Sequence, residues 1–149
     1  MKKVLLYLML VSFLSLVGCT SQAFRPSDLE PSTAVVTEGK IKGNVKEEQI
    51  QSFKEKITLV FENLTDTVYY YGVDFTLEVE LDDTWYQVPF DEGVAFIEIA
   101  MLLEGKAMNE EVIDLADYFD KLPAGNYRVI KHFQAEEQTI TIAPTFEVK

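Results

Sequence analysis

The chain has 149 residues, and its 25 acidic and 13 basic side chains give it a formal net charge of −12. This strong negative charge repels nucleic acid and anionic lipid, so nucleic acid is excluded as a partner. The single cysteine rules out a disulfide within the chain, so a hydrophobic core must stabilise any folded domain.

The N-terminus has the features of a secretory signal peptide. Lys2 and Lys3 precede an apolar run over residues 4–17, which ends at Gly18 and Cys19. The run is shorter than the roughly 20 residues of a transmembrane helix, although an uncleaved signal anchor is the alternative. The site resembles a lipobox, where prolipoprotein processing attaches a diacylglycerol to the cysteine thiol, and acyl chains such as palmitate then anchor the protein. We therefore expect a lipoprotein held on the extracytoplasmic face of the cell membrane.

Three regions follow from this pattern. Residues 1–18 are the predicted lipoprotein signal peptide, and its loss would change the net charge from −12 to −14, because two lysines leave with it. Residues 19–53 are predicted to be the lipidated N-terminus and a linker, because they are polar and show no clear apolar period. Residues 54–149 are predicted to form one domain.

From Ile57 onward, apolar and polar residues alternate with a period of two, which is typical of half-buried β-strands. Asp82 and Asp83 predict a tight turn, and Pro89 and Pro144 predict strand edges. The predicted strands cover residues 57–62, 67–71, 75–81, 85–88, 107–113, 127–133 and 139–148.

Residues 94–103 form an apolar run that periodicity alone cannot assign to a strand or a helix. We favour a strand, because β-branched residues and Phe96 dominate its first half. Residues 114–120 look like one helical turn with three aspartates, which is followed by a turn at residues 122–125.

Many short strands at even spacing predict a sandwich or a barrel. Tyr127 opens a strand directly after a turn, which resembles a tyrosine corner, in which the hydroxyl bonds to backbone a few residues upstream. In that register Val129 is buried, whereas Arg128 and His132 face solvent.

Four segments, in this order and spacing, resemble a bacterial immunoglobulin-like domain found in small exported proteins and lipoproteins, mostly of Gram-positive bacteria. They are residues 57–66, 71–75, 85–89 and 122–129. The resemblance covers roughly residues 54–149 and implies an all-β, immunoglobulin-like antiparallel β-sandwich. It carries over no catalytic residue.

The residues themselves also argue against an enzyme. After Ser52 the chain has no serine or cysteine, and His132 is its only histidine, so a Ser-His or Cys-His site inside the domain is excluded. We expect no cofactor and no metal. Aspartates at 114, 117 and 120 could offer oxygens to Ca²⁺, but no calcium-loop motif is present, and solvated turns explain them.

Aromatic residues gather in the first half of the domain. Alternation places Tyr69 and Tyr71 on one strand face and Tyr70 on the other, so we expect at least one of the three to be exposed, and Tyr70 is the candidate. With Trp85 and Tyr86 it is the candidate interaction surface, although ordinary core packing is the alternative.

We therefore expect a monomeric, lipid-anchored binding or envelope-interaction module with an unidentified protein or envelope partner. One alternative is an inhibitor or accessory subunit that caps a secreted hydrolase through an edge strand or loop. The other alternative is a hydrolase that uses carboxylates, which would require a cleft.

Overall fold

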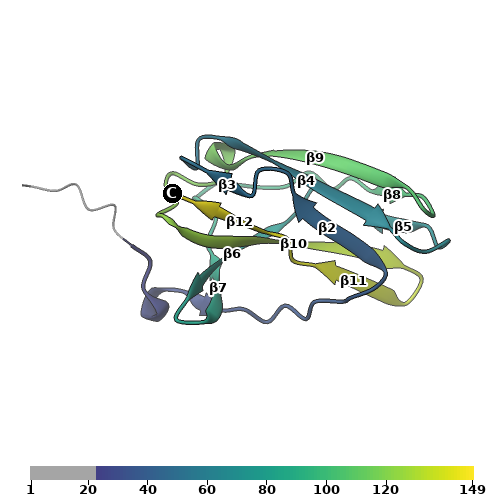
Figure 1. The fold of residues 1–149 in the computed structure, drawn as a ribbon, viewed down its shortest axis with the longest axis horizontal. Helices are drawn as coiled ribbons and strands as arrows, with labels where there is room; N and C mark the ends of the chain where they lie inside the picture. The colour runs from purple at the N-terminus through teal and green to yellow at the C-terminus, as the bar shows by residue number, and fades with distance from the viewer. Residues whose placement is uncertain (1–22) are drawn as a thin grey trace, which may run out of the picture.

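The computed structural model describes residues 23–149, so the predicted signal peptide and Cys19 lie outside the described residues. The described chain is built of β-strands in two packed sheets, with two single 3₁₀ turns (Figure 1). This is the all-β sandwich that the sequence predicted. The elements are η1 (Pro26–Asp28), β1 (Glu30–Pro31), β2 (Ile41–Val45), β3 (Gln49–Ile50), β4 (Lys56–Asn63), β5 (Tyr69–Tyr71), β6 (Thr76–Leu81), β7 (Thr84–Val88), β8 (Met101–Leu103), β9 (Met108–Asp114), η2 (Leu115–Asp117), β10 (Gly125–Ala135), β11 (Gln138–Ile142) and β12 (Thr145–Val148). None of the helices in this part of the chain has the length and hydropathy to cross a bilayer.

The large sheet is organised around β10, its longest strand. Its main path runs β1-β7-β6-β10-β12-β3, while β11 and β5 also pair with β10, and β8 pairs with β5. All of these ladders are antiparallel except β12 with β3. The small sheet has the order β2-β4-β9, so β9 is an edge strand with β4 on one side only.

Aromatic side chains join the two sheets across the core. The ring of Phe61 on β4 lies 4.9 Å from that of Tyr71 on β5 and 5.0 Å from that of Phe133 on β10, both edge to face. All three side chains are buried. Their size lets a disulfide-free domain bury a large apolar area, which is the main stabilising term in folding.

The tyrosine corner is present as predicted. Tyr127 is fully buried, and its hydroxyl donates a 2.6 Å hydrogen bond to the carbonyl oxygen of Pro123. Burial raises the pKa of the Tyr127 hydroxyl, so it remains a proton donor. The strand register also holds, because Val129 is buried and His132 is exposed.

The turn between β6 and β7 also forms as predicted. Asp82 and Asp83 have φ values of 50° and 59°, and they connect the paired residues Leu81 and Thr84. Two positive φ values are typical of a type I′ turn, whose twist matches that of the strands it joins. Aspartate tolerates this region better than most residues do.

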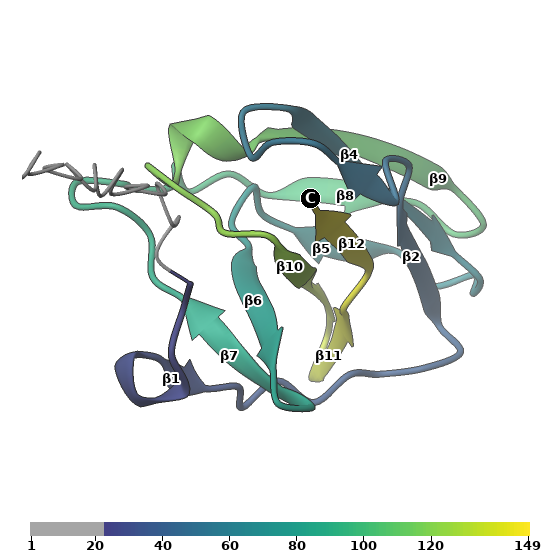
Figure 2. The ribbon, with the colours of Figure 1, turned by 60° about the vertical axis from the view of Figure 1, so that its left-hand side comes forward.

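The predicted boundary at residue 54 is too late, because the sheets include strands from the segment assigned to the linker. β2 pairs with β4 over five residues, and its Ile41 and Val45 are buried in the core. Upstream, β1 pairs with β7. In Figure 2 the blue coil from β1 to β2 passes the β6–β7 hairpin along the lower side of the domain. These elements are too short to produce a visible apolar period.

The prediction of a strand over residues 94–103 is correct only for its last part. β8 covers Met101–Leu103, whereas residues 94–100 have no strand partner. Phe96 explains the difference, because its ring packs 5.5 Å from Phe75, 5.3 Å from Phe90 and 5.5 Å from Tyr118. Phe96 alone packs against the core here, while its neighbours Ala95 and Ile97 remain exposed.

Candidate functional site

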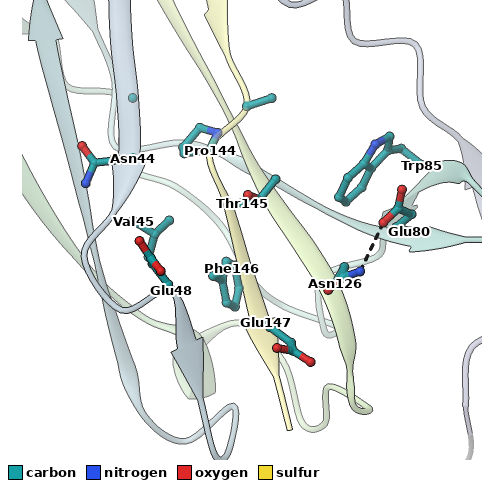
Figure 3. A pocket seen from close by; sticks show the side chains of 12 residues that line it. Asn44, Val45, Glu48, Glu80, Trp85, Asn126, Pro144, Thr145, Phe146 and Glu147 are labelled. Atoms are coloured by element: carbon teal, nitrogen blue, oxygen red, sulfur yellow. Dashed lines mark hydrogen bonds between the residues drawn. The ribbon is translucent and has the colours of Figure 1, made fainter.

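An open groove of about 690 Å³ lies over β12 (Figure 3). β12 lines its middle, with β2 and the chain leading to β3 on one side and the β6–β7 hairpin on the other. The groove forms there because β12 is only four residues long and lies between β10 and the two-residue β3. The lining residues are Gly43, Asn44, Val45, Glu48, Glu80, Trp85, Asn126, Ala143, Pro144, Thr145, Phe146 and Glu147.

The groove is acidic and carries no basic side chain among its lining residues. Glu147 accepts hydrogen bonds from Lys149 at 2.5 Å and from Gln49 at 2.7 Å, and these bonds lower the pKa of its carboxyl group. Asn126 donates to Glu80 at 3.3 Å. The side chains can therefore accept hydrogen bonds from a ligand and attract positive charge, and Trp85 adds an aromatic wall.

Trp85 is held in place by a buried ion pair beside the groove. The Arg128 guanidinium lies 4.4 Å from the centre of the indole ring, and its Nε donates to Glu78 at 2.6 Å. Ser32 joins this cluster, because its hydroxyl donates to Glu78 at 2.5 Å and accepts from Arg128 at 3.2 Å. We call residues 32–37 the N-terminal strap. The backbone amide of Ser32 bonds to the carbonyl oxygen of Trp85 and that of Thr37 bonds to the carbonyl oxygen of Thr141, so the strap is held at both ends.

The expectation that Arg128 faces solvent is therefore wrong. Its side chain is 13% exposed, and that of its partner Glu78 is 1% exposed. Arg128 does lie on the outer face of the sheet, as its register predicts, but the strap and Trp85 cover that face. A residue's parity along a strand indicates its face, whereas only the tertiary structure shows what covers the face.

The three predicted interaction residues do not form one surface. Trp85 lines the groove, and Tyr86 is partly buried where Pro31 of β1 pairs with it. Tyr70 is 54% exposed and pairs with Gln134, which is six residues along β10 from Arg128, and the Arg128 guanidinium stacks on Trp85. At about 3.3 Å per residue, this places Tyr70 roughly 20 Å from Trp85 along the sheet. Tyr70 therefore belongs to a different surface, while the buried Tyr69 and Tyr71 confirm the predicted alternation.

A second ion pair lies between the two sheets. Lys131 of β10 is fully buried, and its Nζ donates to Glu111 Oε1 at 3.0 Å. Glu111 Oε2 is 2.8 Å from the same Nζ but outside hydrogen-bond geometry. Burial lowers the pKa of Lys131 and raises that of Glu111, against the attraction between them.

This pair could have been found from the sequence. Lys131 has the same parity as Val129 and Phe133, so the predicted register already placed a lysine toward the core. Its partner Glu111 lies on the edge strand β9 and points inward. Each charge of this pair compensates the burial of the other, so removal of either partner would leave a buried charge without compensation.

Neither a histidine-based catalytic triad nor a metal-ligand cluster is found among residues 23–149. His132 is exposed, and its Nδ1 lies 2.8 Å from the hydroxyl of Thr141, but no hydrogen bond in the described residues joins the imidazole to an orienting carboxylate. No group of three or more potential metal ligands is found in this part of the chain, and that includes the aspartates at 114, 117 and 120. The groove presents carboxylates, amides and an indole, which can bond to and stack against a ligand.

The comparison with family models agrees with this architecture, whereas the other two comparisons give no match. No curated protein and no solved structure matches the chain significantly. The family model for the bacterial Ig-like domain matches residues 37–147, which begins close to β2 and ends within β12. The match covers most of the chain and both sheets, so the chain belongs to the bacterial Ig-like domain family.

Proposed function

We propose that this protein is a lipid-anchored binding module, held on the extracytoplasmic face of the membrane through Cys19. The observation that carries the proposal is a lipobox with the chain's single cysteine, placed directly before an Ig-like domain. Two or more acyl chains on that cysteine and its amine would anchor the protein stably. The domain would then present the groove over β12 to a protein or envelope partner.

The structure supports a short tether. Phe24 and Leu29 pack against the core, and β1 begins at Glu30, so the domain holds much of the segment expected to be free. Phe24 follows Cys19 by five positions, and this stretch spans at most about 18 Å when fully extended. The domain would therefore work close to the bilayer, and its partner would have to be within reach of the membrane surface.

One observation favours the alternative role of an inhibitor or accessory subunit of a secreted hydrolase. The edge strand β9 is seven residues long and pairs on one side only, so it can offer a backbone edge to an enzyme. The carboxylate-based hydrolase has no comparable support. Glu111 combines burial with a raised pKa, but it is paired with Lys131 and lies outside the groove.

Replacement of the cysteine tests the anchor. Wild-type protein should fractionate with membranes and incorporate a palmitate analogue. Cys19→Ala lacks the thiol that accepts the lipid, so any Cys19→Ala chain that has lost its signal peptide should be unlabelled and absent from the membrane fraction. Cys19→Ser is the matched variant, since its side chain has nearly the size of cysteine but no thiol, and it should behave as Cys19→Ala does. A processed Cys19→Ala chain that remains on the membrane would refute the anchor.

Crosslinking in intact cells tests the groove. A photoreactive residue at Thr145, on the exposed face of β12, should capture a partner, and Trp85→Ala should reduce that capture. The same photoreactive residue at the exposed Val35 is the control for non-specific capture. Equal capture at both positions would contradict a binding role for the groove.

A further inference from the structure

The chain that leads into β8 is extended and is held at both ends. Phe96 anchors its start in the aromatic cluster with Phe75, Phe90 and Tyr118. At its end, Met101–Leu103 pairs with β5. In Figure 2 this stretch is the thin coil that enters the β8 arrow. A segment held in this way loses little conformational freedom when a partner binds.

The backbone of this segment is free to pair. Within the described residues, no hydrogen bond joins the backbone of residues 95–99 to another part of the chain. Backbone N–H and C=O groups without internal partners beside a strand end can be bonded by another extended chain, which adds as a strand. The backbone geometry therefore selects an extended occupant rather than a helix or a compact small molecule.

Large apolar side chains surround this free backbone. Ile97 is 71% exposed and Ile99 is 46% exposed. Next to them, Leu102 and Tyr70 are paired across β8 and β5 and are 47% and 54% exposed. The Leu102–Tyr70 pair and the two isoleucines are thus exposed apolar side chains on adjoining segments, and tyrosine is enriched at protein interfaces.

The charge of the segment indicates what kind of strand it accepts. Residues 86–105 contain four carboxylates, including Glu98 between the two isoleucines, and no lysine, arginine or histidine. A second copy paired antiparallel about this point would bring its own Glu98 against the first, which is unfavourable. An anionic lipid surface would also be repelled, so a basic segment is the complementary occupant.

We propose that residues 97–99, together with Tyr70 and Leu102, bind an extended basic segment of a partner protein, which adds alongside them as a β-strand. The proposal rests on the role of the protein as a binding module, but it does not depend on lipid at Cys19. It names a surface separate from the groove over β12.

Amide hydrogen exchange on the full chain in detergent micelles tests this proposal. The probe is a short synthetic peptide of alternating lysine and valine, and the readout is the peptic fragment that contains residues 97–99. The peptide should slow exchange there by about tenfold or more at saturation, because the amides gain partners. An analogue with N-methylated backbone amides should give no protection, since it cannot pair as a strand.

Two matched variants test the charge. Glu98→Lys should weaken peptide binding about tenfold, because it replaces attraction with repulsion within the proposed binding segment. Glu38→Lys makes the same charge change at an exposed residue before β2 and should alter binding less than about twofold. Equal effects of the two variants would overturn the assignment of the binding site.

Other outcomes also overturn the proposal. Protection that appears without peptide and grows with protein concentration would identify a second copy as the occupant. Protection by anionic vesicles but not by the peptide would identify a lipid surface. Protection confined to β12 would place the peptide in the groove. A failure here would leave the fractionation result for Cys19 unaffected, so the two proposals are tested separately.

Discussion

Removal of one hydroxyl from the core tests the tyrosine corner. Tyr127→Phe keeps the buried ring and deletes the donor of the 2.6 Å bond to the Pro123 carbonyl. Both residues are buried, so the carbonyl would be left without its partner. A lost hydrogen bond with an unsatisfied buried acceptor costs about 1–3 kcal/mol, and we expect about 2 kcal/mol of unfolding free energy to be lost.

Urea unfolding of the chain after the signal peptide measures this loss. With a slope of about 1.5 kcal/mol per molar urea, the midpoint should fall by about 1.3 M while the slope stays unchanged. Tyr70→Phe is the matched control, because its side chain is 54% exposed and should change stability by less than about 0.5 kcal/mol. A Tyr127→Phe variant as stable as Tyr70→Phe would refute the stabilising role assigned to the Tyr127 hydroxyl.

The two buried ion pairs give further predictions. Arg128→Ala should cost about 3 kcal/mol in urea unfolding, because it leaves the carboxylate of Glu78 buried without its charge partner, whereas a joint replacement of both residues by leucine should cost less. Lys131→Met should lower the unfolding free energy by about 3 kcal/mol at neutral pH for the same reason, since it leaves the carboxylate of Glu111 without its charge partner. Burial raises the pKa of the Glu111 carboxyl above its ordinary value of 4.5, so the folded variant binds a proton more readily than the unfolded chain. The unfolding free energy of the variant should therefore fall as pH rises above about 4.5 and recover on acidification. Stability of the Lys131 variant that does not vary with pH would contradict this assignment.

Much of the fold was predictable because its signals are local in the sequence. The period-two alternation placed β4, β6, β7 and β10, and it set the faces of Tyr70, Val129 and His132 correctly. Tyr127 and the turn before it are four residues apart, so the tyrosine corner was recognisable as a short motif. The lipobox is likewise a continuous motif, and the anchor that it predicts awaits the test at Cys19.

The tertiary structure decided what lies between residues that are far apart in the chain. Arg128 meets Glu78 across a sequence separation of 50 and Ser32 across a separation of 96, so no local pattern could show that the strap covers this face. Residues 95–100 have the composition of a buried strand, yet Phe96 alone enters the core and Ile97 remains exposed. Apolar composition measures the tendency to be buried, but whether a side chain is buried depends on which distant strands and loops pack over it, and that is a property of the folded chain.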